Sequence, residues 1–242
     1  GWDHAATLAT RHNIAAVFEA MGRLDEALTT YEAILDEWNR TGTSDPQKVI
    51  PTRFNIAVTL GRQERHQEAL EVYEGLLQDH NDLLGPDHPG TLLIRMSIAV
   101  ALRNLGQFND ALAIARSVLA HQERVLGLEH PDTLRTRHEI PASLEELGRN
   151  DEALECYRTV LADQERVLGP EHPDTLATRQ SIAYSWGLAG RMDQALANHK
   201  AVLHDQEKVL GADHPETLKT RHNIAHCLGE LGLVTEALVY EQ

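Results

Sequence analysis

Residues 10–31 read TRHNIAAVFEAMGRLDEALTTY, and the same pattern returns every 42 residues along the chain. Four features repeat at this step: an arginine, an isoleucine three places after it, an alanine–leucine pair and, in the later copies, a histidine–proline pair. The arginines are Arg11, Arg53, Arg95, Arg137, Arg179 and Arg221. A repeat period of roughly 20–50 residues is typical of solenoids, in which each unit buries its apolar side against the next.

Each copy has the apolar spacing of two helices joined by a glycine. Ile14, Phe18 and Met21 lie on one face of a first helix, and residues 27–35 repeat this spacing in a second helix. The glycine between them would take a left-handed conformation that ends the first helix. Glu64 replaces this glycine in the second copy, which predicts a slightly strained turn. No strand pattern appears, so the sequence predicts an all-α solenoid of antiparallel helix pairs.

The 42-residue step divides residues 1–242 into about five and a half repeats of one continuous solenoid. The expected boundaries are 1–42, 43–84, 85–126, 127–168, 169–210 and an incomplete 211–242. The chain opens inside a repeat loop and stops inside a second helix, without the polar capping element that usually ends a solenoid. We therefore expect it to be a piece of a longer protein.

Composition excludes several classes of partner. The 22 Lys and Arg residues stand against 37 Asp and Glu residues, which gives a net charge of −15. A surface that binds nucleic acid or anionic lipid needs a basic stripe, so neither partner is expected. No stretch is long and apolar enough to span a membrane. The two cysteines, Cys156 and Cys227, form no disulfide framework and fit the reducing cytoplasm.

No enzyme motif occurs in the chain. The phosphate-binding loop GxxxxGK[ST], the dinucleotide fingerprint GxGxxG, the zinc-protease motif HExxH and the nucleophile elbow GxSxG are all absent from the sequence. Paired acidic residues are plentiful, but on a surface with a charge of −15 they are expected to be solvated. The sequence predicts a protein that is not an enzyme and carries no cofactor.

The run Thr10-Arg11-His12-Asn13-Ile14-Ala15, followed by Gly22-Arg23-Leu24-Asp25-Glu26-Ala27-Leu28 and Tyr31, resembles a tetratricopeptide repeat (TPR). The 42-residue length resembles the kinesin-light-chain-like subclass, whose second helix is longer than in the 34-residue form. This resemblance implies a right-handed superhelix whose first helices line a concave groove that binds peptides or protein segments.

The resemblance also implies which residues face the groove. The candidates are Asn13, Phe54, Asn55, Val58, Met96, Val100, His138, Glu139, Tyr184, His222, Asn223 and His226. We call the same position in successive repeats a column. In the family, the asparagine of the column that contains Asn13, Asn55 and Asn223 often hydrogen-bonds the backbone of a bound peptide. These residues make the groove apolar in its first half and acidic with histidines in its second. We therefore expect a protein or peptide partner with an apolar anchor and a basic tract.

The repeated arginines are expected to serve the repeat rather than a ligand. A residue present in all six copies fits a structural role, whereas ligand specificity usually differs between copies. The aliphatic stem would pack between helices while the guanidinium binds a carbonyl or an acid of the preceding unit. Glu123, Glu165 and Glu207 recur near the ends of the preceding helices and are the expected partners.

The histidines raise the question of a metal. The loop residues His88, His130, His172 and His214 lie one repeat apart, too far for two of them to share a zinc ion, and are expected to hold loop backbone groups. His222 and His226 are four residues apart on one helix face, a spacing that can chelate a metal. No third ligand is identifiable, so the sequence predicts no metal site, and a metal-dependent enzyme centred on this pair stays an alternative.

A second alternative concerns the larger protein. Long-helix repeats with a leucine–glycine–x–x–histidine–proline loop are familiar as the sensor arm of bacterial signalling ATPases of the STAND type. By this resemblance the chain would be a regulatory arm that senses a ligand or restrains the ATPase. A phosphate-binding loop upstream of Gly1 would distinguish this function from that of a free-standing scaffold.

Overall fold

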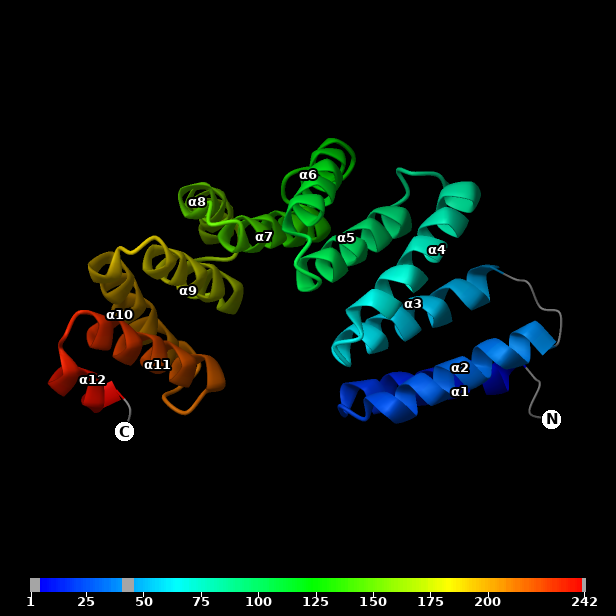
Figure 1. Ribbon diagram of the computed structural model, residues 1–242, viewed down its shortest axis with the longest axis horizontal. Helices are drawn as coiled ribbons and strands as arrows, with labels where there is room; N and C mark the ends of the chain where they lie inside the picture. The colour runs from blue at the N-terminus through cyan, green and yellow to red at the C-terminus, as the bar shows by residue number, and fades with distance from the viewer. Residues whose placement is uncertain (1–4, 41–45, 241–242) are drawn as a thin grey trace. The chain divides into compact units, whose positions relative to one another are not determined.

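The computed structural model describes residues 5–40 and 46–240, and all regular structure in these ranges is α-helical (Figure 1). The helices are α1 (Ala5–Ala20), α2 (Leu24–Arg40), α3 (Pro46–Arg62), α4 (His66–Leu84), α5 (Pro89–Asn104), α6 (Phe108–Val125), α7 (Pro131–Glu146), α8 (Asn150–Val167), α9 (Pro173–Leu188), α10 (Met192–Val209), α11 (Pro215–Glu230) and α12 (Val234–Tyr240). Odd-numbered helices are the first helices of the repeats, and even-numbered helices are the second ones. The predicted all-α fold of paired helices is confirmed.

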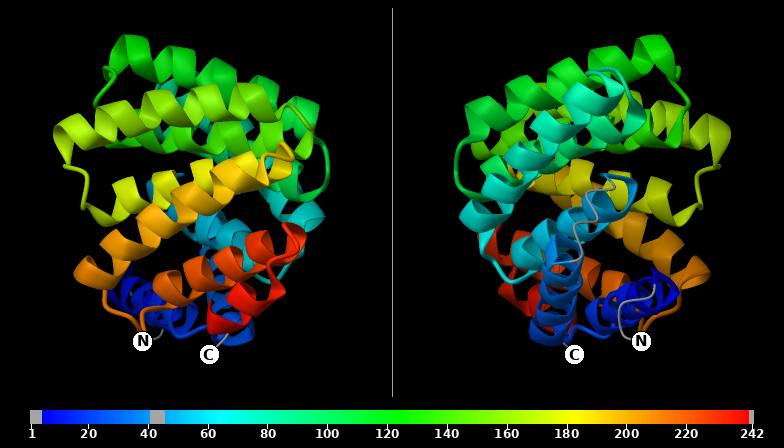
Figure 2. Two further views of the ribbon diagram at one scale, coloured as in Figure 1. Left: turned by 90° about the vertical axis from the view of Figure 1, so that its left-hand side faces the viewer. Right: turned by 90° about the vertical axis from the view of Figure 1, so that its right-hand side faces the viewer.

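The chain divides into two compact units, Gly1–Ile114 and Ala115–Gln242. In unit 1 the helices pack in sequence order, α1 on α2, α2 on α3, α3 on α4 and α4 on α5. In unit 2 the same holds for α7 to α12, and the first helices α7, α9 and α11 also contact one another in order. The pairs within each unit can be followed in Figure 1 and from two further sides in Figure 2.

Small side chains allow the two helices of each repeat to approach closely. The alanine that opens the repeated alanine–leucine pair is at most 8 % exposed in all six copies, Ala27, Ala69, Ala111, Ala153, Ala195 and Ala237. Larger side chains fill the space beside it, and Leu144, Leu154, Leu176 and Leu228 are at most 2 % exposed. The core therefore runs between consecutive helices rather than around one centre, as a repeat fold requires.

The turn between the two helices of a repeat has the predicted left-handed residue. Gly22, Gly106, Gly148, Gly190 and Gly232 have φ between 70° and 78°. Glu64 has a φ of 62° and is the one residue other than glycine with positive φ among those the structure describes. The strain predicted at this turn is confirmed, because a residue with a Cβ atom is disfavoured in this conformation.

Replacing Glu64 with glycine should raise the free energy of unfolding by about 0.5–1 kcal/mol. The left-handed conformation costs a residue with a Cβ atom about 1–2 kcal/mol, and the greater chain entropy of glycine offsets part of that gain. Urea unfolding followed by circular dichroism measures the difference. Glu64→Ala is the control, because alanine keeps the Cβ atom and should leave stability unchanged. A gain of equal size in the alanine variant would contradict the explanation.

The four loop histidines cap the first helices that follow them. His88, His130, His172 and His214 each accept, at Nδ1, a hydrogen bond from the backbone N–H two residues later at 3.1–3.2 Å. A proline follows each of them at the start of the helix, where its missing N–H costs no helical hydrogen bond. The prediction that these histidines hold loop backbone groups is confirmed.

Replacing His172 with alanine should lower the free energy of unfolding by about 1 kcal/mol. The change leaves an N–H group at the start of α9 without its acceptor, and loss of an N-cap side chain typically costs about 0.5–2 kcal/mol. His172→Asn is the matched control, because asparagine is among the strongest N-cap residues and should keep the stability of the wild type. Equal losses in both variants, measured by urea unfolding, would show that the cap is not the cause.

None of the helices in the described ranges combines the length and the apolar content that a bilayer crossing requires.

Candidate binding surface on the first helices

Two pockets open within unit 2, and first helices form walls of both. The first, here called the histidine pocket, has a volume of about 330 Å³ and lies between α9, α10 and α11. Its lining residues are Ala183, Tyr184, Gly187, Leu188, Met192, Ala195, His199, His222, Asn223, His226 and Cys227. Four of the predicted groove residues, Tyr184, His222, Asn223 and His226, therefore share one pocket.

His199 is the buried polar residue of the histidine pocket. It is 2 % exposed, and its Nδ1 has no hydrogen-bond partner among the described residues. Burial lowers the pKa of His199 from 6.5 to about 4, so its ring is neutral at pH 7. A neutral imidazole has one donor and one acceptor nitrogen. The buried polar side chain of the pocket therefore carries no charge at pH 7.

The histidine pocket contains a residue that differs from the one in most other copies of the repeat. The position of His199 is occupied in other copies by Tyr31, Tyr73 and Tyr157, each at most 6 % exposed. An imidazole is smaller than a phenol ring, and Ala183 and Gly187 on the facing wall carry little or no side chain. These small side chains line the pocket together with the imidazole.

The second pocket, here called the glutamine pocket, has a volume of about 540 Å³. It lies where the beginnings of α7 and α9 meet the end of α8. Its lining residues are Glu129, Pro131, Leu134, Arg135, His138, Glu139, Gln164, Val167, Leu168, Asp174 and Ala177. The predicted groove residues His138 and Glu139 both belong to it. Gln164 is 8 % exposed, and its Oε1 has no hydrogen-bond partner among the described residues.

In unit 1 several predicted groove residues are used by the fold itself. The amide nitrogen of Asn55 lies 3.2 Å from the Tyr31 hydroxyl oxygen, to which it donates, and 3.1 Å from Nε2 of His12. The Phe54 ring stands edge-on to Tyr73 with 5.6 Å between the ring centroids. Met96 is only 7 % exposed. Met96 therefore offers little surface to a ligand, whereas Phe54 and Asn55 are half-buried and already contact other side chains of the fold.

The other candidates of unit 1 lie nearer the surface. Asn13 is exposed on α1, and Val58 and Val100 are half-buried on α3 and α5. Val58 packs against the core of unit 1. Of this part of the predicted groove, Asn13 presents the most open side chain.

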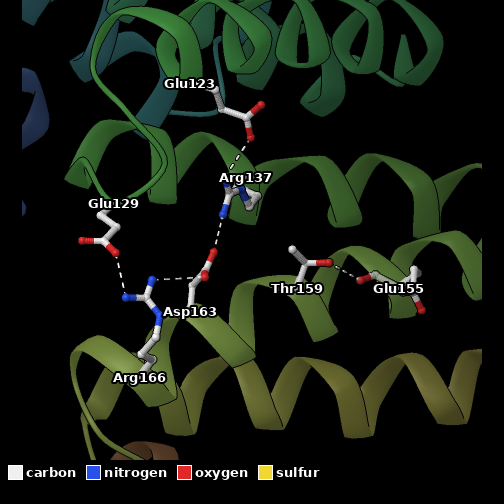
Figure 3. A network of polar contacts seen from close by, with 7 residues as sticks. All are labelled: Glu123, Glu129, Arg137, Glu155, Thr159, Asp163 and Arg166. Atoms are coloured by element: carbon white, nitrogen blue, oxygen red, sulfur yellow. Dashed lines mark hydrogen bonds and ion pairs between the residues drawn. The ribbon is translucent and has the colours of Figure 1, made fainter.

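The repeated arginines bind acidic side chains. Figure 3 shows Arg137 between Glu123 and Asp163, with N–O distances of 2.8 and 2.6 Å. Arg166 extends this network, at 3.5 Å from Asp163 and 2.7 Å from Glu129. Arg137 thus joins the end of α6 to α8 through α7.

The arginines of the other repeats show two arrangements. Arg221 lies 2.6 Å from Glu207, which is the expected kind of partner on the preceding helix. Arg179 pairs instead with Asp205 at 2.6 Å, and Arg53 pairs with Asp79. Arg11 and Arg95 are half-buried on α1 and α5.

Sequence reasoning missed the aspartates that bind these arginines. Asp79, Asp163 and Asp205 each lie 26 residues after their arginine, on the second helix of the same repeat. The signal was present, since the three aspartates occupy one column of the repeat. It also missed His199 and Gln164, whose columns contain tyrosine and glutamine in other copies.

The pair His222 and His226 lines the histidine pocket without a metal-binding set around it. Within the part of the chain that the structure describes, no three His, Cys, Asp or Glu side chains are placed to hold one ion. Cys227 lines the same pocket, and burial raises the pKa of its thiol, which disfavours the thiolate that a metal would need.

Comparison with known proteins identifies the repeat. Two family models described as tetratricopeptide repeat match the chain. One matches residues 4–74 and 48–120, and the other matches residues 133–174 and 175–216. The chain belongs to the tetratricopeptide repeat family. No curated protein sequence is similar enough to the chain to count as a match.

Solved structures place the repeat in the kinesin-light-chain-like type. A kinesin-light-chain-like protein of Podosopora anserina with nearly identical TPR-like repeats is 26 % identical, with a TM-score of 0.72; the match covers 85 % of this chain and 97 % of that one. BtubC (BKLC) from P. vanneervenii has the same TM-score at 14 % identity, covering 90 % and 87 %. A Rap protein in complex with competence and sporulation factor has a TM-score of 0.67 at 12 % identity, covering 97 % and 72 %. The last two similarities show the fold alone.

Proposed function

We propose that the chain is a non-catalytic scaffold that binds a protein segment along the surface formed by its first helices. The observation that carries this proposal is the pair of pockets in unit 2. Both have predicted groove residues on their walls and a buried polar side chain with an unpaired atom. TPR proteins are interaction modules, and a Rap protein of this fold has been crystallised with competence and sporulation factor.

The chemistry of the two pockets suggests the features of the partner. The histidine pocket is lined mainly by apolar and neutral side chains and suits an apolar anchor. The glutamine pocket has three carboxylates, Glu129, Glu139 and Asp174, and one guanidinium, Arg135, which suits a basic residue. We therefore propose a segment that carries an apolar anchor and a basic tract. Two free thiols, Cys156 and Cys227, fit a reducing compartment such as the cytoplasm for this interaction.

A displayed library of random peptides provides the test. Peptides are selected on the wild-type chain, and the dissociation constants of the selected peptides are measured by fluorescence anisotropy. Tyr184 is 53 % exposed and lines the histidine pocket, so Tyr184→Glu should weaken the selected peptides about tenfold or more. Ala197→Glu makes the same change of charge at an exposed position of α10 and should have little effect. Peptides that bind the Tyr184→Glu chain as tightly as the wild type would show that this surface is not the binding site.

A further inference from the structure

Leucine and isoleucine side chains join each repeat to the next one. Leu154 on α8 and Ile182 on α9 belong to one buried cluster. Leu196 on α10 packs against the cluster that contains Ile224 on α11. In unit 1 one cluster contains the corresponding residues of the first three repeats, Leu28, Ile56, Leu70 and Ile98. We call this contact, between the leucine of the alanine–leucine pair and the isoleucine of the next first helix, the repeat junction.

Helix α1 carries one half of a repeat junction on its surface. Ile14 is 45 % exposed, whereas the other isoleucines of its column are at most 6 % exposed, namely Ile56, Ile98, Ile140, Ile182 and Ile224. Val17 and Met21 extend the same apolar side of α1 and are 56 % and 63 % exposed. We call Ile14, Val17 and Met21 the α1 face. Among the described residues no helix precedes α1, so the α1 face has no leucine from a preceding repeat against it.

Helix α12 carries the other half of the junction. Leu238 is 54 % exposed and Leu196 is half-buried, whereas the other leucines of this column are at most 7 % exposed, namely Leu28, Leu70, Leu112 and Leu154. Val234 lies one helical turn before Leu238 and is 61 % exposed. We call Val234 and Leu238 the α12 face. No helix follows α12 in the part of the chain that the structure describes.

The composition of the α1 face indicates that it is covered by another helix. The outer face of a free solenoid end is usually polar, because nothing shields it from water. The column of Val17 contains small or polar side chains in the other repeats, namely Thr59, Ala101, Ser143, Ser185 and Cys227. The first repeat thus has a larger aliphatic side chain at this position, beside an exposed isoleucine and an exposed methionine.

We propose that the α12 face of one copy of the chain 1–242 binds the α1 face of a second copy. Leu238 of one copy then packs beside Ile14 of the other, in the way that Leu196 packs with the cluster of Ile224 within the chain. A second copy is the occupant that these faces fit, because they are the two halves of a contact that recurs inside the chain itself.

The association is head to tail. Each copy uses a different face, so a pair of copies still has one free α1 face and one free α12 face. A contact of this kind adds further copies as the protein concentration rises. Both faces lie outside the histidine pocket and the glutamine pocket, so the association is independent of the proposed function.

Sedimentation equilibrium of the chain 1–242 tests the proposal. The average mass should rise reversibly above that of one chain as the concentration increases. It should rise further in high salt, because salt screens the repulsion between copies that each carry a net charge of −15. Val17→Glu and Leu238→Glu each place a charge on one face and should weaken self-association about tenfold or more, since burial of one aliphatic side chain corresponds to at least that factor.

A mixture of the two variants tests the direction of the contact. The Val17→Glu chain keeps its α12 face and the Leu238→Glu chain keeps its α1 face, so the mixture should form a dimer with one copy of each and no larger species. Val239→Glu is the matched control, because Val239 is 71 % exposed on α12 in a column that is exposed in every other repeat. This variant should associate like the wild type. Met21→Glu replaces Val17→Glu if that variant does not fold.

Each of the remaining outcomes would overturn the assignment. A wild-type chain that stays a monomer at every concentration excludes association between copies, even if α12 closes onto α1 within one molecule. Loss of association in only one of the two face variants would mean that like faces pair, and a monomeric mixture would exclude the head-to-tail contact. An equal loss in Val239→Glu would show that any added charge on α12 prevents association.

Discussion

Replacing Arg137 with alanine is expected to lower the free energy of unfolding by about 2–3 kcal/mol. The Arg137 side chain is 9 % exposed and holds two carboxylates, Glu123 on the preceding helix and Asp163 on the following one. Removing one partner of a fully buried ion pair costs about 3–5 kcal/mol. The two carboxylates here are 35 % and 28 % exposed, so water can solvate them in the variant and the loss is smaller. The packing of the arginine stem is lost as well.

Arg179 provides the matched comparison for this experiment. It occupies the same column, but its side chain is 22 % exposed and it makes one ion pair, with Asp205. Arg179→Ala should therefore cost about 1 kcal/mol, near the upper end for an exposed pair. Arg137→Met keeps an unbranched apolar chain and should recover part of the loss at Arg137. Urea unfolding of the three variants measures these differences, and equal losses in Arg137→Ala and Arg179→Ala would contradict the role of the network in Figure 3.

Acid should destabilise the wild-type chain through His199. Burial lowers the pKa of His199 from 6.5 to about 4. Below pH 6.5 the unfolded chain therefore binds a proton at His199, whereas the folded chain binds it only as the pH approaches 4. The stabilisation from the neutral buried ring is fully present above pH 6.5 and is lost as the pH falls toward 4. A shift of this size corresponds to about 3 kcal/mol, at roughly 1.4 kcal/mol for each pKa unit.

His199→Tyr isolates this contribution. Tyrosine is the residue of the same column at Tyr31, Tyr73 and Tyr157, so the variant should fold and fill the histidine pocket. Urea unfolding of both chains at pH 7 and pH 4.5 should show a larger acid-induced loss for the wild type. Parallel losses would mean that His199 titrates near its ordinary pKa and is not buried as described. Both chains contain the same carboxylates, so the effect of carboxylate protonation on the free energy of unfolding is the same in both and cancels in the comparison.

Much of the fold was readable from the internal repeat. The recurring alanine–leucine pairs, glycine turns and histidine–proline starts predicted paired helices, and the strained turn at Glu64 and the capping role of His172 are both observed. These features are local, because a turn or an N-cap depends on residues within one or two turns of helix. That residues 1–242 form one continuous solenoid stays a prediction.

The partners of the arginines were only partly predictable. Glu123 and Glu207 were found from their place near the end of the preceding helix. Asp163 and Asp205 were missed, because 26 residues of chain separate them from their arginines and the pairing depends on how the two helices of one repeat pack. The repeat period shows which positions carry the same residue type in successive copies, but it does not predict which of these positions contact one another in the folded chain.

Repetition alone established what kind of protein this is: a chain of similar helix pairs, each turned and capped by its own residues, whose apolar faces need a neighbouring pair. Only the packed structure decided which first-helix side chains remain available. Asn55 and Tyr184 both occupy groove positions by their register, yet Asn55 is bound to Tyr31 while Tyr184 stands at an open pocket. The reason is that a pocket forms where the side chains of neighbouring helices do not fill the space between these helices. Its size depends on the side chains of three helices at once, here α9, α10 and α11, and no single repeat contains that information.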